Sequence, residues 1–153
     1  VHRRKDDNMQ KLLRRIHPLT GAMAILCIAS FMTASIIAEL YGNPQTIAVM
    51  KHAILWGLLV LIPCLAFTGL SGYRVTGTAP RGLALTKFKR MRVIGINGVC
   101  ILVPCAFFLA LRASELKFDW LFYGVQLIEL LAGATNLALL GMNFRDGLRM
   151  TRS

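Results

Sequence analysis

Charged residues are few in this sequence, and long stretches have none. They make up 16% of the 153 residues, whereas hydrophobic residues make up 56%. Acidic residues are the scarcest, with seven Asp and Glu against 18 Lys and Arg, which gives a formal net charge of +11. A soluble domain of this length would spread its charges over a polar shell around one core. The uncharged stretches therefore exclude a soluble globular domain and favour an integral membrane protein.

Motifs of catalysis, metal binding and nucleic-acid binding are also missing. No HExxH, phosphate-binding glycine loop or nucleophile arrangement occurs. Four cysteines lie within apolar stretches, at Cys27, Cys64, Cys100 and Cys105. They form no CxxC or Cys/His spacing, so neither a disulfide framework nor a zinc site is expected. The basic residues lack interleaved aromatic side chains, which argues against nucleic acid and leaves anionic lipid headgroups as their expected partners. We expect no catalytic residues and no metal site, and nothing here argues for an enzyme.

Four apolar segments have the length of membrane spans. They cover about residues 18–40, 50–72, 93–111 and 120–143. Roughly 20 residues are enough to cross about 30 Å of hydrocarbon at about 1.5 Å per residue. Because the first and third connections are short, spans that are neighbours in sequence should be antiparallel. The sequence predicts a single domain, an all-α up-down bundle of four transmembrane helices.

A short amphipathic segment precedes the first span. Apolar residues recur at helical spacing with basic residues between them, in the set Met9, Lys11, Leu12, Leu13, Arg14, Arg15 and Ile16. This pattern predicts a short interfacial helix on the inner leaflet. Pro18 suits the first turn of the span that follows.

Basic residues are concentrated on one side of the predicted bundle. The N-terminal segment and the connection after the second span each have six Lys or Arg, and the C-terminal tail has three. The other two connections together have three, which are Lys51, Arg112 and Lys117. Because basic residues near span ends resist translocation, both termini should be cytoplasmic. With no recognisable transit peptide, we expect the inner membrane of a bacterium.

The fourth span carries one polar face. Its polar residues fall within an arc of about 100°, and they are Gln126, Glu129, Asn136 and Asn143. Exposure of this face to lipid would be costly, so it should be turned toward other helices, a water-filled cavity or a partner protein.

Glu129 is the one acidic residue that lies in the middle of a predicted span, away from its ends, and two interpretations of it stay open. It is either a proton or ligand site, as intramembrane ionisable groups often are, or a neutral carboxyl that sets the register of the helices. The candidate partners of a neutral carboxyl are Gln126, Asn97 and a hydroxyl of the first span such as Ser30 or Thr33.

The histidines bear on a haem hypothesis. Membrane cytochromes of the b type hold haem between paired histidines at one depth. Here His17 lies at the inner end of the first span and His52 at the outer end of the second, so the two cannot share a haem within one monomer. Haem b would need either His/Met ligation or a site on a dimer axis. The candidate pairs are His17 with Met91 or Met142 on the inner side and His52 with Met50 on the outer side. The alternative is that both histidines are polar residues at span ends.

In size and number of spans the chain is similar to the small four-helix cytochromes and membrane-anchor subunits of respiratory complexes, and it departs from them at these histidines. The leading hypothesis is a non-enzymatic accessory or anchoring subunit of a larger inner-membrane assembly, since the polar stripe of the fourth span is available for helix contacts. One alternative is an electron-transfer protein that carries haem b or contacts quinone. The other is a small oligomeric proton-coupled transporter. The expected partners are lipids and other membrane subunits or further copies of the chain.

Overall fold

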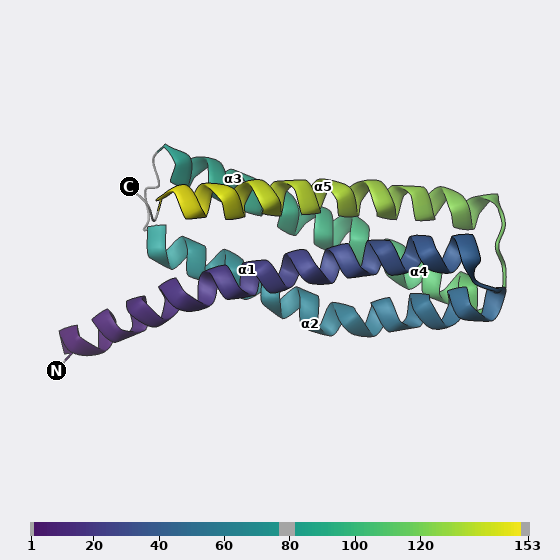
Figure 1. Cartoon of the computed structure of the whole chain (residues 1–153), viewed down its shortest axis with the longest axis horizontal. Helices are drawn as coiled ribbons and strands as arrows, with labels where there is room; N and C mark the ends of the chain where they lie inside the picture. Colours follow the sequence, from purple (N-terminus) through teal and green to yellow (C-terminus); the bar gives the residue numbers. More distant parts are fainter. Residues whose placement is uncertain (1, 77–81, 151–153) are drawn as a thin grey trace.

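The structure is a computed structural model, and it describes residues 2–76 and 82–150. These residues form α1 (His2–Tyr41), α2 (Pro44–Thr76), α3 (Leu83–Asn97), the π-helix η1 (Gly98–Leu102), α4 (Val103–Ser114) and α5 (Trp120–Met150). α3, η1 and α4 follow one another without a break and are together called the third span. The described residues thus form four long helical segments, which lie alongside one another (Figure 1).

All four segments are long and apolar enough to cross a membrane, which confirms the predicted all-α bundle. The spanning portions are Ile16–Tyr41, Pro44–Gly72, Leu83–Ser114 and Trp120–Arg149. The third begins ten residues earlier than predicted, because the basic residues Lys87, Lys89, Arg90 and Arg92 belong to a helix rather than to a loop. Figure 1 shows that α1 begins and α5 ends at one end of the bundle, called the terminal end. The opposite end, with the α1–α2 and α4–α5 connections, is called the distal end.

The segment before the first span is helical, as predicted, but it is not a separate helix. α1 continues through Pro18 for 40 residues, and its first part extends beyond the bundle (Figure 1). The side chains of residues 2–11 and 13–15 lie outside the described part of the chain, as do residues 77–81 of the connection between α2 and α3. An interfacial location of the first part of α1 stays a prediction.

Side-chain caps start the two helices that follow the distal connections. Asn43 Oδ1 accepts a hydrogen bond from the Thr46 amide at 2.8 Å, and Asp119 Oδ1 accepts one from the Phe122 amide at 3.0 Å. Such caps satisfy amides that have no partner within the first turn of a helix. Because α2 already begins at Pro44, Lys51 lies about two turns inside it and not in the loop where the sequence placed it.

The third span changes its hydrogen-bond pattern at its middle. The Val103 amide donates to the carbonyl of Gly98, five residues earlier, which is the spacing of a π-helix. Pro104 follows directly and has no amide hydrogen to donate to the Cys100 carbonyl. The wide turn accommodates the proline ring without ending the helix.

Two groups of buried apolar residues form the core. The larger one joins all four helical segments and consists of Ala24, Ile28, Leu58, Leu61, Ile94, Ala106 and Leu140. The other lies toward the distal end and consists of Ala38, Ile47, Leu109, Ala113 and Phe122. Many large apolar side chains point outward instead, as expected of a surface that faces lipid.

Gly42 is needed in the tight turn between α1 and α2. Its amide donates to the Ala38 carbonyl at 2.9 Å, and a Cβ at this position would overlap that same backbone oxygen. The turn would have to shift, so we expect Gly42→Ala to lower the free energy of unfolding by about 1–3 kcal/mol. Melting in detergent measures the effect. Gly124→Ala is the matched control, because a Cβ there meets nothing within 4 Å. Equal melting temperatures for the two variants would contradict this turn geometry.

Candidate functional site

Lys51 of α2 is buried in the distal half of the bundle, with 2% of its surface exposed. Its ammonium lies 2.6 Å from Ser35 Oγ and 3.2 Å from Glu129 Oε2. It also donates to Gln126 Oε1 and forms an ion pair with Glu39 Oε1 at 3.5 Å. Side chains from α1 and α5 thus surround one ammonium that α2 carries. We call these five residues, Lys51, Ser35, Glu39, Gln126 and Glu129, the distal cluster.

Helical spacing explains why these side chains converge. Ser35 and Glu39 are four residues apart on α1, and Gln126 and Glu129 are three apart on α5, so each pair lies on one face of its helix. Phe122, one turn before Gln126, is fully buried, and its ring centre lies 6.0 Å from the Lys51 ammonium. The cluster is therefore covered on its distal side by an aromatic ring and held in place by three helices.

The distal cluster has more negative than positive charge. With all groups ionised, one ammonium and two carboxylates give a net charge of −1. Among the described residues, Glu39 Oε1 and Gln126 Nε2 have no hydrogen-bond partner. From α4, the Cys105 thiol is within electrostatic reach of Glu129. A net charge is expensive in a low-dielectric interior, so this arrangement favours uptake of a proton or a cation.

Two neighbouring cavities lie between the distal cluster and the apolar middle of the bundle. The smaller, of about 50 Å³, has Glu129 and Ser35 as its polar wall, and Phe31 and Met32 among its apolar lining. The larger, of about 290 Å³, lies between α2 and the third span. Both are lined by Ile28, Leu58, Leu61 and Leu102.

Asn97 and Asn136 form a separate contact between the third span and α5. Asn97 Nδ2 donates to Asn136 Oδ1 at 2.8 Å and to the Ala132 carbonyl at 2.9 Å, and Asn136 Nδ2 donates to the Ile94 carbonyl at 3.3 Å. Asn97 is therefore engaged away from Glu129. The hydroxyl of the first span that joins the cluster of Glu129 is Ser35, whereas Ser30 and Thr33 are exposed.

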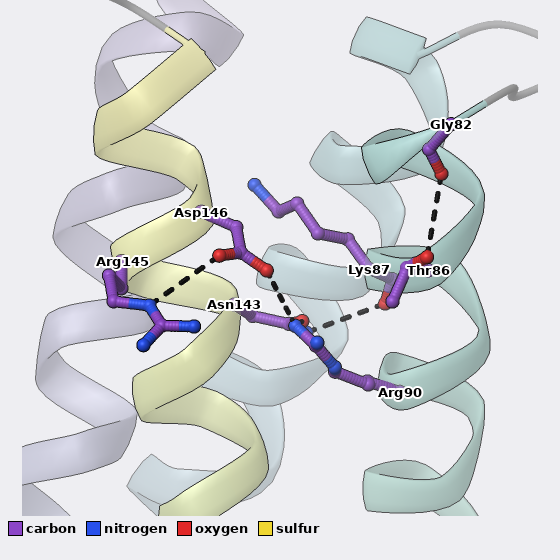
Figure 2. Close-up of polar contacts among 7 residues, drawn as sticks. All are labelled: Gly82, Thr86, Lys87, Arg90, Asn143, Arg145 and Asp146. Atoms are coloured by element: carbon purple, nitrogen blue, oxygen red, sulfur yellow. Dashed lines mark hydrogen bonds and ion pairs between the residues drawn. The ribbon is translucent and has the colours of Figure 1, made fainter.

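A third polar contact joins α3 and α5 near the terminal end (Figure 2). Arg90 Nη1 lies 2.7 Å from Asp146 Oδ2 and 3.4 Å from Asn143 Oδ1, and Arg145 lies 3.6 Å from Asp146. Asn143 also donates to the Lys87 carbonyl at 3.4 Å. Figure 2 shows the Arg90 and Asp146 side chains pointing toward one another from their two helices. With its carboxylate matched by guanidinium groups, this contact fits a structural role.

The polar face of α5 is thus used within the chain. Gln126, Asn136 and Asn143 are all buried, and Glu129 is nearly so. They do not form one site, because Gln126 and Glu129 contact α2 whereas Asn136 and Asn143 contact α3 at other depths. This stripe is not left on the surface for a partner protein.

The candidate haem ligands lie in separate places. His17 Nδ1 is 2.9 Å from Ser71 Oγ at the terminal end, whereas His52 Nε2 is 3.2 Å from Ser114 Oγ at the distal end. Met91 packs against the larger core group beside Gly69, and Met142 is half-buried on α5. In the described part of the chain, no three His, Cys, Asp or Glu side chains converge as metal ligands would.

The sequence analysis did not identify Lys51, Glu39 and Asp146 as charged residues that lie within the helical bundle. Asn43 followed by Pro44 is a signal of a helix start, and it would have placed Lys51 inside the second span. The pairing of Asp146 with Arg90 joins distant segments and has no such local signal.

Comparisons with protein-family models, with curated proteins and with solved structures gave no match to this chain. Its function is therefore inferred from the distal cluster and the cavities beside it. The net charge of the cluster and the space in the cavities are the features that indicate a binding site.

Proposed function

We propose that this chain is a small proton-coupled carrier that works as an oligomer in the inner membrane of a bacterium. The observation that carries the proposal is the distal cluster, in which two carboxylates share one ammonium inside the bundle. Ionisable groups at membrane depth are costly to bury and typically mark ion or substrate pathways. Glu129 is the proton-binding residue, since it also lines the smaller cavity.

The charge of the cluster provides the coupling. A proton on one carboxylate neutralises the net charge of −1, and so does a bound cation. Both at once would leave the site positive, which is again unfavourable in the interior. The proton and the cation therefore compete for one site, and this competition is the basis of their exchange across the membrane.

The other two hypotheses have less support. The subunit hypothesis depended on a polar stripe available for contacts, and the stripe of α5 is engaged within this chain. The electron-transfer alternative depended on His17 and His52, which lie at opposite ends of the bundle. His17 contacts Ser71, and His52 contacts the Ala48 carbonyl and Ser114. The distal cluster therefore favours the carrier.

Two measurements test the carrier. Infrared spectra of the purified protein at neutral pH should show a protonated carboxyl group that Glu129→Gln removes. Proteoliposomes with an imposed pH gradient should lose it when one member of a panel of monovalent inorganic and organic cations is added, and Glu129→Gln should prevent this loss. A parent protein with no protonated carboxyl, or no response to any cation, would contradict the proposal.

The orientation is proposed from the basic residues, with the terminal end in the cytoplasm. The described basic residues at that end include Lys87, Lys89, Arg90, Arg145 and Arg149, which would meet anionic lipid headgroups. We expect reporter fusions at Ser114 to report the outside and fusions at Ser153 to report the inside. Ser114 ends α4 at the distal end, whereas Ser153 lies outside the described residues. An external Ser153 fusion would contradict this topology.

A further inference from the structure

The larger cavity can be reached from the lipid. Its walls are α2 and the third span, and several lining residues are also on the outer surface of the bundle. Ile62 of α2 is 45% exposed, and Val99 of the third span is 66% exposed. The space beside Gly95, another lining residue, is open, because a Cβ there would meet nothing within 4 Å. A molecule dissolved in the bilayer could enter sideways at this place.

The larger cavity is lined by apolar residues, whereas the smaller cavity beside it has a polar wall. The two cavities share Leu58, Leu61 and Leu102, and the smaller one ends at the Glu129 carboxyl and the Ser35 hydroxyl. The Phe31 ring lines the same end. An apolar groove that leads to a carboxylate beside an aromatic ring fits a molecule with an apolar body and a small cationic head.

We propose that the substrate of this carrier is a lipophilic amine in its protonated form. The inference rests on the proposed function and names its substrate class. The apolar body occupies the groove between α2 and the third span, and the ammonium forms an ion pair with Glu129. A primary ammonium is also the group that the cluster already binds in Lys51, with Ser35 as an acceptor. An anionic head would have no free cation to pair with in the cluster, because Lys51 already pairs with Glu39.

The exchange is balanced in charge and protons. The protonated amine enters with its positive charge, the Glu129 carboxyl gives up its proton, and the two form an ion pair. One proton leaves for each amine bound, while Lys51 keeps its ion pair with Glu39. The site therefore has the same net charge before and after exchange.

The test uses three probes with the same chain, octylammonium, 1-octanol and octanoate, added to the full-length protein in a maltoside detergent. We expect octylammonium to raise the melting temperature and to release one proton per molecule bound in weakly buffered solution. The neutral and anionic probes should do neither. Loss of the ion pair in Glu129→Gln should weaken octylammonium binding by at least about tenfold, or about 1.4 kcal/mol.

Gly95→Leu tests the groove separately from the charge. A Cβ at position 95 meets nothing within 4 Å, so we expect the variant to fold with its leucine side chain in the groove and to lose octylammonium binding. Gly124→Leu is the matched control, because it adds the same side chain to open space on α5, away from both cavities. It should bind octylammonium like the parent. If Glu129→Gln fails to fold, the Gly95→Leu and Gly124→Leu pair decides the result.

The outcomes distinguish a failure of the proposed substrate class from a failure of the proposed carrier function. Equal binding of 1-octanol and octylammonium, or unchanged binding in Gly95→Leu, would overturn the amine proposal. If octylammonium does not bind but another cation dissipates the pH gradient, the substrate class is wrong and the carrier stands. If octylammonium binds without proton release and no cation moves protons, the amine site stands without its release step and the carrier is wrong.

Discussion

We expect Lys51→Met to lower the free energy of unfolding of the bundle by about 3–5 kcal/mol at neutral pH. This is the range observed when one partner of a buried ion pair is removed and the other charge is left unpaired. Methionine has nearly the length of the lysine side chain, but it lacks the ammonium group that pairs with both Glu39 and Glu129. Ser35 and Gln126 would also lose the donor that they share. Titration of the protein with SDS, followed by circular dichroism, measures the change.

The loss of stability in Lys51→Met should increase as pH rises. Without Lys51, both Glu39 and Glu129 favour their protonated forms in the folded state, whereas in the unfolded state they ionise readily at neutral pH. The folded state then binds more protons than the unfolded state, so stability falls as pH rises. Each proton that the folded variant retains adds a slope of about 1.4 kcal/mol per pH unit, so the loss of stability is largest at high pH. The Lys51→Met variant should therefore approach the parent at acidic pH.

Two controls keep this prediction specific. Adding Glu39→Gln and Glu129→Gln to Lys51→Met removes the uncompensated charges and should restore most of the lost stability. Lys117→Met removes a lysine from an exposed pair with Glu115, at 2.8 Å, and should change stability by less than about 1 kcal/mol. In the parent, the hydrogen bond from Lys117 lowers the pKa of Glu115. If Lys51→Met matched Lys117→Met in stability, the ammonium of Lys51 would not be buried among carboxylates.

The fold could be predicted from the sequence because its cause is local. Each span is a run of apolar residues long enough to cross a bilayer, and such a run must form its backbone hydrogen bonds internally. The ends of the spans were less predictable. The segment with Lys87, Lys89, Arg90 and Arg92 resembles a polar loop by charge count, but its long side chains can extend to the membrane surface while the backbone stays helical.

The site could be predicted only in part, because it is formed by contacts between helices that are distant in the sequence. The spacing on α5 shows that Gln126 and Glu129 share a face, and the cost of exposing that face to lipid indicates that it turns inward. Nothing in that spacing identifies the partner. The partner is Lys51, which had been counted as a loop cation, and the second carboxylate is Glu39, at the predicted end of the first span. A charge near a span end is ambiguous until the helix start is known, and here the start depends on the Asn43 cap.

The second large effect is expected from Glu129→Gln, which should abolish proton-coupled transport without destabilising the fold. Glutamine keeps the size of the side chain and an oxygen that accepts a hydrogen bond from Lys51, whose other partners Ser35, Glu39 and Gln126 remain. The remaining Lys51–Glu39 pair has no net charge, so the folded state no longer retains an extra proton. If Glu129 holds the proton as proposed, the pH dependence of stability should therefore be smaller in the variant than in the parent. Above neutral pH the variant should be as stable as the parent or more so, which is the pattern expected of a residue kept for function at the expense of stability.

Glu129→Leu separates the two interpretations of this carboxyl. Leucine offers no acceptor to Lys51 and leaves a buried donor short of one partner, so we expect a loss of about 1–3 kcal/mol in addition to the loss of transport. A purely structural Glu129 would give a different pair of results, with transport retained in Glu129→Gln and the pH dependence of stability unchanged. Melting curves in detergent across pH, together with dissipation of a pH gradient in proteoliposomes, distinguish the two. If Glu129→Leu is as stable as the parent at every pH, Glu129 does not contact Lys51 in the bundle, and the distal cluster cannot be the proton site.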